Sequence, residues 1–365
     1  MAKTAIYLIL AATSLFGQTY RYWDSNGNGN PSILDGSGTW NVSGSKEWYN
    51  GTTNVNWDNS AGWTAVLGNG GTAGTVTVSS TIVATGIVLQ PATGSYTLAG
   101  TMGMPLQLGS GGITANDSAT ITTDIQLNAA QSWTVAGGQS VQFSGTIIGS
   151  VSLQKDGTGT LAFTAASPSM SGTVTVSAGK LSVTNTSGSA TGTGGVIIGN
   201  GGTLEGTGFI TGLVQVQSGG IIAPGVSSAT GIGTLTLGSA SVAAGGSINL
   251  GISSTSSFDR LVINNNLSMS TSGAINLTLN AGFTPAAGQS FDLVDWGSLS
   301  FGGANLASTL SLPDISAYNL AWDSSAFNAT GTVSIVAAIP EPGRALLTGL
   351  GLCATLLRRR RAAAR

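Results

Sequence analysis

From residue 153 the sequence reads LQKDGTGTL (153–161), then SGTVTVSAGKL (171–181) and then GGTLEGTG (201–208). In these segments Val and Leu alternate with small or polar residues, and glycines separate the alternating runs. A period of two residues predicts β-strands with one buried face. Glycine permits tight bends between such strands because it tolerates positive φ. The stretch therefore predicts short strands joined by glycine corners.

The spacing of apolar residues predicts a repeating coil. Val176 and Leu204 lie 28 residues apart, and Leu204 and Leu235 lie 31 apart. Both spacings fall within the roughly 20–45 residues of a solenoid repeat. In a solenoid the apolar side chains of successive turns stack inside, so the interior needs no charge. The composition agrees, because 41% of the residues are apolar and only 7% are charged.

The three segments also resemble the autotransporter-associated β-strand repeat, in which a Lys-x-Gly-x-Gly-Thr-Leu strand precedes a Gly-Thr-Val-x-Val strand and an Ala-Gly-x-Leu strand. Residues 219–225, 233–237 and 283–288 match the same family pattern. The resemblance implies a right-handed parallel β-helix. An autotransporter would end in a membrane barrel of roughly ten-residue alternating strands. This chain instead resembles the passenger alone, so we expect export by separate machinery.

Further strands are expected on both sides of this stretch. No segment of the body has a 3.6-residue apolar stripe, so we predict an all-β solenoid domain over 72–336. Aromatic residues return near its end, which predicts last coils and a C-terminal cap. The expected strands are 74–78, 94–98, 121–127, 133–135, 141–143, 247–252, 260–263, 274–279, 291–294 and 331–336.

Residues 19–71 form a Trp/Tyr-rich segment that we interpret as an N-terminal cap, because an elongated stack of strands must cover its first open face. A carbohydrate-stacking surface is the alternative interpretation. Its candidate glycan contacts are Trp23, Trp40, Trp48, Trp57 and Trp63.

The same segment carries part of a calcium-loop pattern. Asp24, Asn26, Asn28, Gly29 and Asp35 occupy positions 1, 3, 5, 6 and 12. Oxygen ligands at alternate positions, with a glycine at the sharp turn, suit calcium coordination. However, the last position lacks the usual glutamate, a proline interrupts the loop and no amphipathic helices flank it. An Asn/Gly-rich turn gives the same letters, so both interpretations stand.

The C-terminal stretch 340–361 differs from the body. The motif Pro340-Glu341-Pro342 precedes the apolar run 345–357. The run is shorter than the roughly 20 residues of a full span, but the four guanidiniums after it would hold its end on the cytoplasmic side of a membrane. We therefore expect one C-terminal transmembrane helix, with a plain membrane anchor as the alternative. The residues expected to stop the helix at the membrane are Arg358, Arg359, Arg360 and Arg361.

The order of PEP motif, apolar helix and arginine cluster resembles the PEP-CTERM sorting signal of Gram-negative bacteria. The resemblance implies export, transient anchoring in the inner membrane and processing near the PEP motif by an exosortase-type enzyme. Residues 1–18 agree with this, because Lys3, the apolar run 5–16 and Gly17 suit a signal peptide cleaved by signal peptidase.

The composition excludes several kinds of chemistry. The chain has no histidine, and its one cysteine, Cys353, lies in the apolar tail. The body therefore lacks Ser-His-Asp catalysis, histidine metal sites and disulfides. Between residues 18 and 339 acidic residues outnumber basic ones 13 to 5, which argues against a nucleic-acid partner.

No acidic pair suggests catalysis. Asp292 and Asp295 are the closest body pair, but three-residue spacing on a strand would point them to opposite faces. Asp259-Arg260 is interpreted as an exposed pair, and Lys155-Asp156 as part of a turn. We therefore predict a protein that is not an enzyme and needs no cofactor, with calcium as the open exception.

The sequence thus favours a noncatalytic exported protein of the cell surface or extracellular matrix, with extracellular polysaccharide as a candidate partner. A carbohydrate-binding adhesin is the second hypothesis, and a polysaccharide-active enzyme is the third.

Overall fold

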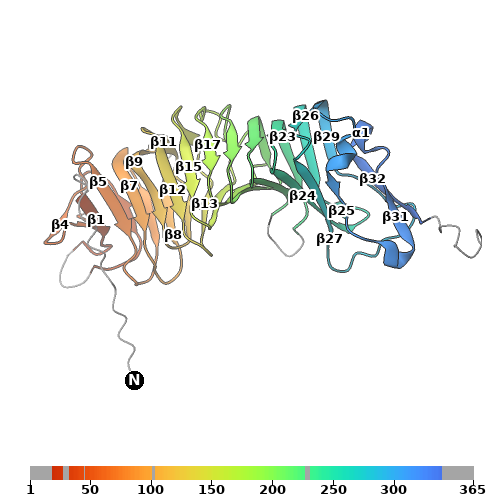
Figure 1. Cartoon of the computed structure of the whole chain (residues 1–365). Coiled ribbons are helices and arrows are strands. Elements are labelled where there is room, and N and C mark those ends of the chain that lie inside the picture. Colours follow the sequence, from red (N-terminus) through yellow and green to blue (C-terminus); the bar gives the residue numbers. More distant parts are fainter. Residues whose placement is uncertain (1–18, 28–32, 45, 101–102, 227–230, 339–365) are drawn as a thin grey trace, which may run out of the picture.

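A computed structural model describes residues 19–338 except 28–32, 45, 101–102 and 227–230. These residues form an elongated β-solenoid of about nine turns, drawn in Figure 1 as an arched stack of strands. Almost all neighbouring strands of its two large sheets pair in parallel. The predicted all-β parallel solenoid is therefore confirmed. Segments 1–18 and 340–361, with the predicted signal peptide, PEP motif and transmembrane helix, lie outside the described residues.

Two large sheets run the length of the described chain. Sheet A contains β1 (Thr19–Trp23), β3 (Trp48–Tyr49), β4 (Asn54–Val55), β5 (Trp63–Leu67), β7 (Ile82–Leu89), β9 (Leu106–Ala115), β11 (Ile125–Leu127), β12 (Gln131–Val135), β14 (Ile147–Ile148), β15 (Leu153–Asp156), β17 (Val174–Val176), β19 (Val196–Ile198), β21 (Phe209–Val216), β23 (Thr234–Val242), β26 (Arg260–Met269) and β29 (Val294–Phe301). Sheet B contains β2 (Gly38–Trp40), β6 (Thr75–Val78), β8 (Tyr96–Gly100), β10 (Ala119–Ile121), β13 (Ser140–Phe143), β16 (Thr160–Phe163), β18 (Gly179–Val183), β20 (Gly202–Gly206), β22 (Ile221–Pro224), β24 (Ser247–Ser254), β25 (Ser257–Phe258), β27 (Ala274–Leu279) and β30 (Leu310–Ser311).

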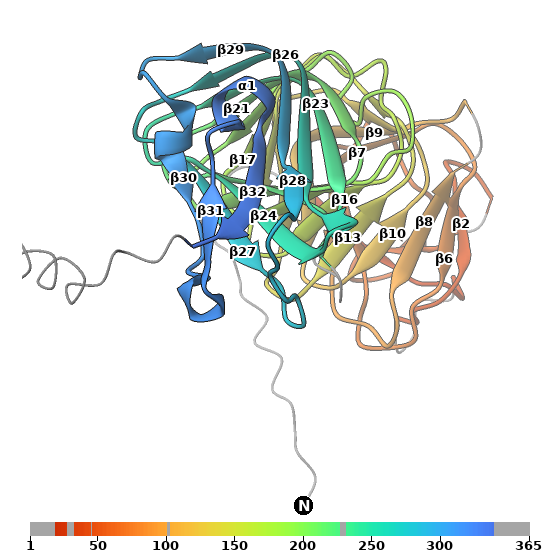
Figure 2. The ribbon, with the colours of Figure 1, turned by 90° about the vertical axis from the view of Figure 1, so that its right-hand side faces the viewer.

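Sheet A bends, so that a typical turn has three strand segments. The first part of β9 pairs with β11 through Leu106–Leu108, and its last part pairs with β12 through Ile113–Ala115. The paired strands β7 and β9 change register between these two parts. The bend and sheet B together enclose one continuous interior, which Figure 2 shows from the end of the stack.

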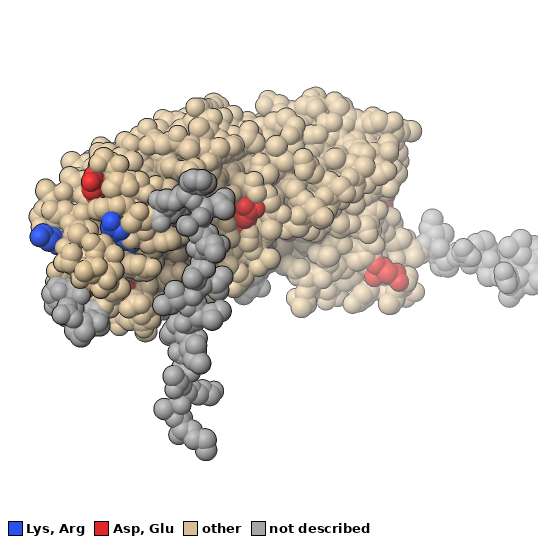
Figure 3. Space-filling view, turned by 60° about the vertical axis from the view of Figure 1, so that its left-hand side comes forward, with Lys and Arg blue, Asp and Glu red and all other residues tan. Residues whose placement is uncertain are grey.

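Alternation fills this interior with apolar side chains. In β16, Leu161 and Phe163 are buried while Thr160 and Ala162 face outward. Leu161 pairs in register with Leu181 of β18, which pairs with Leu204 of β20. The apolar ladder is interrupted on sheet A, where Lys155 lies in register between Trp133 and Val176. Figure 3 shows few charged side chains on the face in view.

The predicted repeat spacing is wrong, because it compared positions on different sheets. Val176 belongs to sheet A and pairs with Ile198, 22 residues further on. Leu204 belongs to sheet B and pairs with Ile222, 18 residues further on. Alternation identified the strands, but it could not assign them to a sheet.

Two predicted strands are each divided in the structure. The segment 121–127 turns a corner at 122–124 between β10 and β11, so its halves belong to different sheets. The segment 291–294 divides at Leu293, between β28 (Ser290–Asp292) and β29. In both places the alternating run before the corner is short, so the sequence pattern does not show where the strand ends.

The two ends of the described solenoid are closed differently. At the N-terminal end, β3 and β4 extend sheet A in antiparallel fashion beyond β1. At the C-terminal end, β28 joins β32 (Thr332–Ala337) and β31 (Leu320–Asp323) in a separate antiparallel sheet. The short helices η1 (Leu306–Thr309), η2 (Ser316–Tyr318) and α1 (Phe327–Thr330) lie in this C-terminal region.

Candidate functional site

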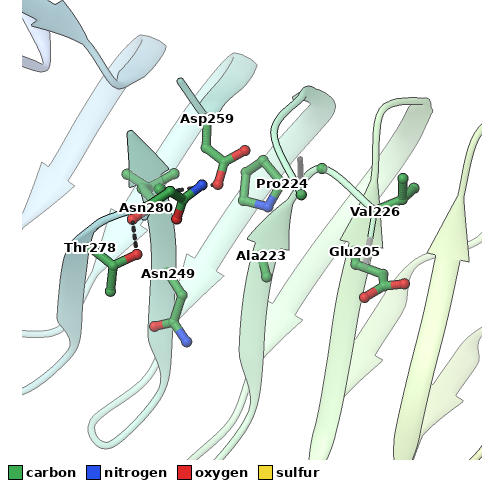
Figure 4. A pocket seen from close by; sticks show the side chains of 12 residues that line it. Glu205, Ala223, Pro224, Val226, Asn249, Asp259, Thr278 and Asn280 are labelled. Carbon is green, nitrogen blue, oxygen red and sulfur yellow. Dashed lines mark hydrogen bonds between the residues drawn. The ribbon is translucent and has the colours of Figure 1, made fainter. Parts of the chain in front are cut away.

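A pocket of about 210 Å³ opens on the outer face of sheet B. Its lining side chains come from consecutive turns, and Figure 4 shows them side by side on neighbouring strands. They alternate with core residues such as Leu204 and Ile222, which point the other way. The principal polar lining residues are Glu205, Asn249, Asp259, Thr278 and Asn280.

Two small residues create the hollow. Ala223 of β22 lies directly beside Glu205 of β20, and Gly251 of β24 lies directly beside Thr278 of β27. A methyl group and a hydrogen therefore stand next to longer side chains. A Cβ added at Gly251 would come within 3.2 Å of Asn280 Oδ1, so even one extra carbon would enter this space.

Hydrogen bonds hold the polar walls in place. The Nδ2 of Asn276 donates to Asn249 Oδ1 at 2.8 Å, and the Nδ2 of Asn280 donates to Ser253 Oγ at 2.8 Å. On the opposite side, Glu205 is 6% exposed and its Oε2 lies 3.2 Å from Lys180 Nζ. The pocket is thus lined by amide and carboxylate groups with fixed positions.

Asp259 is a buried acid at the edge of the pocket. Its Oδ1 accepts a hydrogen bond from Gly233 N and its Oδ2 accepts one from Gly251 N, both at 2.8 Å. Burial raises the pKa of Asp259 to about 6, and the two backbone donors oppose that rise. Because Asp259 ties two backbone segments together, its first role is structural. The sequence interpretation of Asp259-Arg260 as an exposed pair is wrong for Asp259, which is buried.

A second ionic cluster joins Arg260 to both Asp292 and Asp295. The Arg260 Nη2 lies 2.7 Å from Asp292 Oδ2 and also contacts Asp295. The expectation that the two acids face apart is therefore wrong, because the strand breaks at Leu293 between them. Burial, followed by the Asp295 charge, raises the pKa of Asp292. One arginine that bridges both acids indicates a structural link between β26 and the C-terminal end.

Lys155 of the repeat motif is completely buried. Its Nζ donates to the carbonyl oxygens of Asp156 and Gly157 at 2.8 Å and of Ala178 at 3.1 Å. Burial lowers the pKa of Lys155 to about 8, although the Asp156 charge opposes this shift. Lys155 and Asp156 are the last residues of β15, so the interpretation of this pair as part of a turn is wrong; the ammonium group instead satisfies three carbonyls at the corner that follows the strand.

The candidate glycan-contact tryptophans lie inside the N-terminal end. Trp23, Trp40, Trp48 and Trp57 are at most 2% exposed, and Trp63 is partly buried against them. The ring centroid of Trp48 lies 4.7–5.2 Å from those of Trp23, Trp40 and Trp57. A sugar stacks on a ring face that is open to solvent. The burial of four of these rings therefore favours the cap interpretation.

The candidate calcium ligands are directed to different partners. Asp24 is buried and accepts hydrogen bonds from Leu34 N and Asn54 Nδ2. Asp35 accepts from Asn69 N, Gly71 N and the Tyr96 hydroxyl at 2.7–2.8 Å. Asn26 is exposed and Asn28 is not among the described residues. Both carboxylates thus have structural partners, and calcium binding stays a prediction.

Two kinds of feature are absent from the described part of the chain. No helix there is long and apolar enough to cross a membrane. No group of three or more Cys, His, Asp or Glu side chains is placed there to hold a metal ion.

The predicted sorting residues all lie outside the described part of the chain, so the PEP motif and the arginine block stay predictions. These residues are Pro340, Glu341 and Pro342 of the motif, and Arg358, Arg359, Arg360 and Arg361 of the block.

A scan of the chain against protein-family models finds no match, and a search of curated proteins also finds none.

Proposed function

We propose that this chain is a noncatalytic exported protein of the cell surface or extracellular matrix of a Gram-negative bacterium. In this proposal, signal peptidase removes residues 1–18 and the C-terminal helix anchors the chain transiently in the inner membrane. An exosortase-type enzyme then processes the chain near Pro340. The body is a right-handed β-helix of the passenger type.

The observation that carries the proposal is an elongated solenoid body followed in the sequence by a PEP motif, an apolar run and an arginine cluster. The body has 13 acidic and 5 basic residues between positions 18 and 339, and the described acids mostly hold backbone segments or ion pairs. A long repetitive surface of Thr, Ser, Asn and Gly suits a spacer or matrix element. The tail supplies the expected route to the surface.

The sorting part is tested with the natively expressed protein and a variant in which Pro340, Glu341 and Pro342 are all alanine. We expect the native product to lack the arginine block by intact mass and to occur at the surface or in the medium. The variant should stay in the membrane fraction. A full-length product in the inner membrane in both cases would make the tail a permanent anchor and contradict the proposal.

Carbohydrate binding is the second candidate function. The burial of four tryptophans gives no support to a tryptophan platform at the N-terminal end. The polar pocket on sheet B is the observation that favours carbohydrate binding. A polysaccharide-active enzyme has weaker support, because Asp259 is committed to two backbone hydrogen bonds and Glu205 to an ion pair.

A further inference from the structure

We propose that the sheet B pocket binds one neutral sugar residue, such as the terminal residue of a glycan, between Glu205, Asn249 and Asn280. The proposal rests on the second candidate function, carbohydrate binding, and goes beyond the surface or matrix role by naming the site and the class of ligand. It depends only on the pocket and would hold whether or not the tail directs sorting.

The size of the pocket sets the first limit on the ligand. Its volume of about 210 Å³ lies below the roughly 300–1,000 Å³ of pockets for drug-sized ligands. The hollow exists because Ala223 and Gly251 stand where neighbouring turns have longer side chains. It is therefore suited to one ring and is too small to enclose an oligosaccharide, whose remaining residues would extend into solvent.

The lining groups set the second limit. Amide side chains both donate and accept hydrogen bonds, and the carboxylate of Glu205 accepts them, as the hydroxyl groups of a sugar require. Asn249 and Asn280 are each held by a neighbouring polar side chain at 2.8 Å, so they need little ordering on binding. Ala223, Pro224 and Val226 add an apolar side for the C–H groups of a sugar ring.

The charges favour a neutral ligand. Glu205 and Asp259 line the pocket, so an anionic sugar would approach two acids. A metal cation is also disfavoured, because both Asp259 oxygens accept backbone hydrogen bonds and Glu205 pairs with Lys180. An uncharged ligand with hydroxyl groups can pair with the hydrogen-bond donors and acceptors of the pocket without placing another charge beside the two acids.

The test is a substitution that fills the hollow without changing a core residue. Ala223 points away from the interior, so Ala223→Gln should block the pocket and leave folding unchanged. Ala162→Gln is the matched control. Ala162 also faces outward on sheet B, three strands before Ala223, in the row of paired residues Ala162, Ser182, Glu205 and Ala223. Equal melting temperatures of the two variants and the parent chain would show that folding is intact.

Binding is measured by saturation-transfer NMR on the full chain in a detergent that carries no sugar. The probes are glucose, galactose, mannose and N-acetylglucosamine, with glucuronate as the anionic probe. We expect saturation transfer to at least one neutral sugar, a loss of about tenfold or more in affinity in Ala223→Gln, and no change in Ala162→Gln.

Three results would overturn the proposal: no transfer to any neutral sugar, equal binding by Ala223→Gln, or preferred binding of glucuronate. Release of free sugar from a methyl glycoside of the bound sugar would also overturn it, since the pocket would then be an active site. None of these readouts depends on where the cell places the protein, so failure of sorting and failure of binding are distinguishable.

Discussion

The two ends of the described solenoid are held together by different kinds of contact. At the N-terminal end, four tryptophans pack against one another in the interior, and Trp48 contacts the other three. At the C-terminal end lies a separate three-stranded antiparallel sheet, in which Phe291 of β28 is buried, and Phe327 of α1 is also buried. Arg260 then ties this end to the body through Asp292 and Asp295.

The difference shows two solutions to one problem. A stack of strands leaves an open interior and free strand edges at each end, and both must be covered. At the N-terminal end, buried indole rings fill the interior, and the acids that hold the surrounding backbone, such as Asp24 and Asp35, do so through hydrogen bonds. The C-terminal end adds surface ion pairs to its aromatic contacts, so its stability should depend on salt concentration.

The largest expected effect is at the N-terminal end. Trp48→Ala should lower the free energy of unfolding by about 3–5 kcal/mol, because it leaves a cavity among three other indoles. Urea unfolding checks the change, and retention on immobilised glycan is measured on the same samples. Tyr22→Ala is the matched control, since Tyr22 lies beside Trp23 in β1 but is 39% exposed.

A stable Trp48→Ala variant that had lost glycan retention would contradict the cap interpretation and support a tryptophan platform. A destabilised variant, with Tyr22→Ala near the parent chain, would support the cap.

The sequence predicted the strands of this fold better than their partners. Alternation at Val174 to Val176 and around Leu181 located two strands, because burial on one face fixes the alternating pattern. It could not show that Val176 and Leu204 belong to different sheets. Sheet membership depends on where the corners fall, and a corner is marked only by residues that also occur within strands.

The candidate site was hidden for the same reason. Ala223 and Gly251 are ordinary small residues along the chain. They form a hollow only because neighbouring turns place Glu205 and Thr278 beside them. Likewise, Asp292 and Asp295 share one arginine because the strand breaks at Leu293, and nothing in the local pattern marks that break.

A smaller effect on stability is expected at Asp259, the residue before Arg260 in the C-terminal ionic cluster. Its pKa is raised from 3.8 to about 6, so between these values the folded state binds more protons than the unfolded state. Its contribution to stability is therefore present at low pH and is lost as pH rises toward 6. Each pKa unit corresponds to about 1.4 kcal/mol, so the loss should be about 1–3 kcal/mol.

Asp259→Asn should remove this decrease in the free energy of unfolding with rising pH. Urea unfolding at several pH values between about 4 and 6 measures it. Glu205→Gln is the control in the same pocket. An unchanged slope in Asp259→Asn would contradict the assignment of the pH dependence to this buried acid.

The smallest expected effect compares one arginine at each end. Arg260→Met removes ion pairs whose side chains are 35–41% exposed, so it should cost only about 0.2–1 kcal/mol, and less at high salt because the charges are screened. Arg21 instead lies 3.9 Å from the centroid of the Trp63 ring, and Met in its place would keep an apolar contact with that ring. Arg21→Met should therefore cost a similar amount with little dependence on salt. Urea unfolding of both variants at low and high salt measures the contrast. If the two variants lost stability with the same dependence on salt, ion pairs would not be what distinguishes the C-terminal end from the N-terminal end.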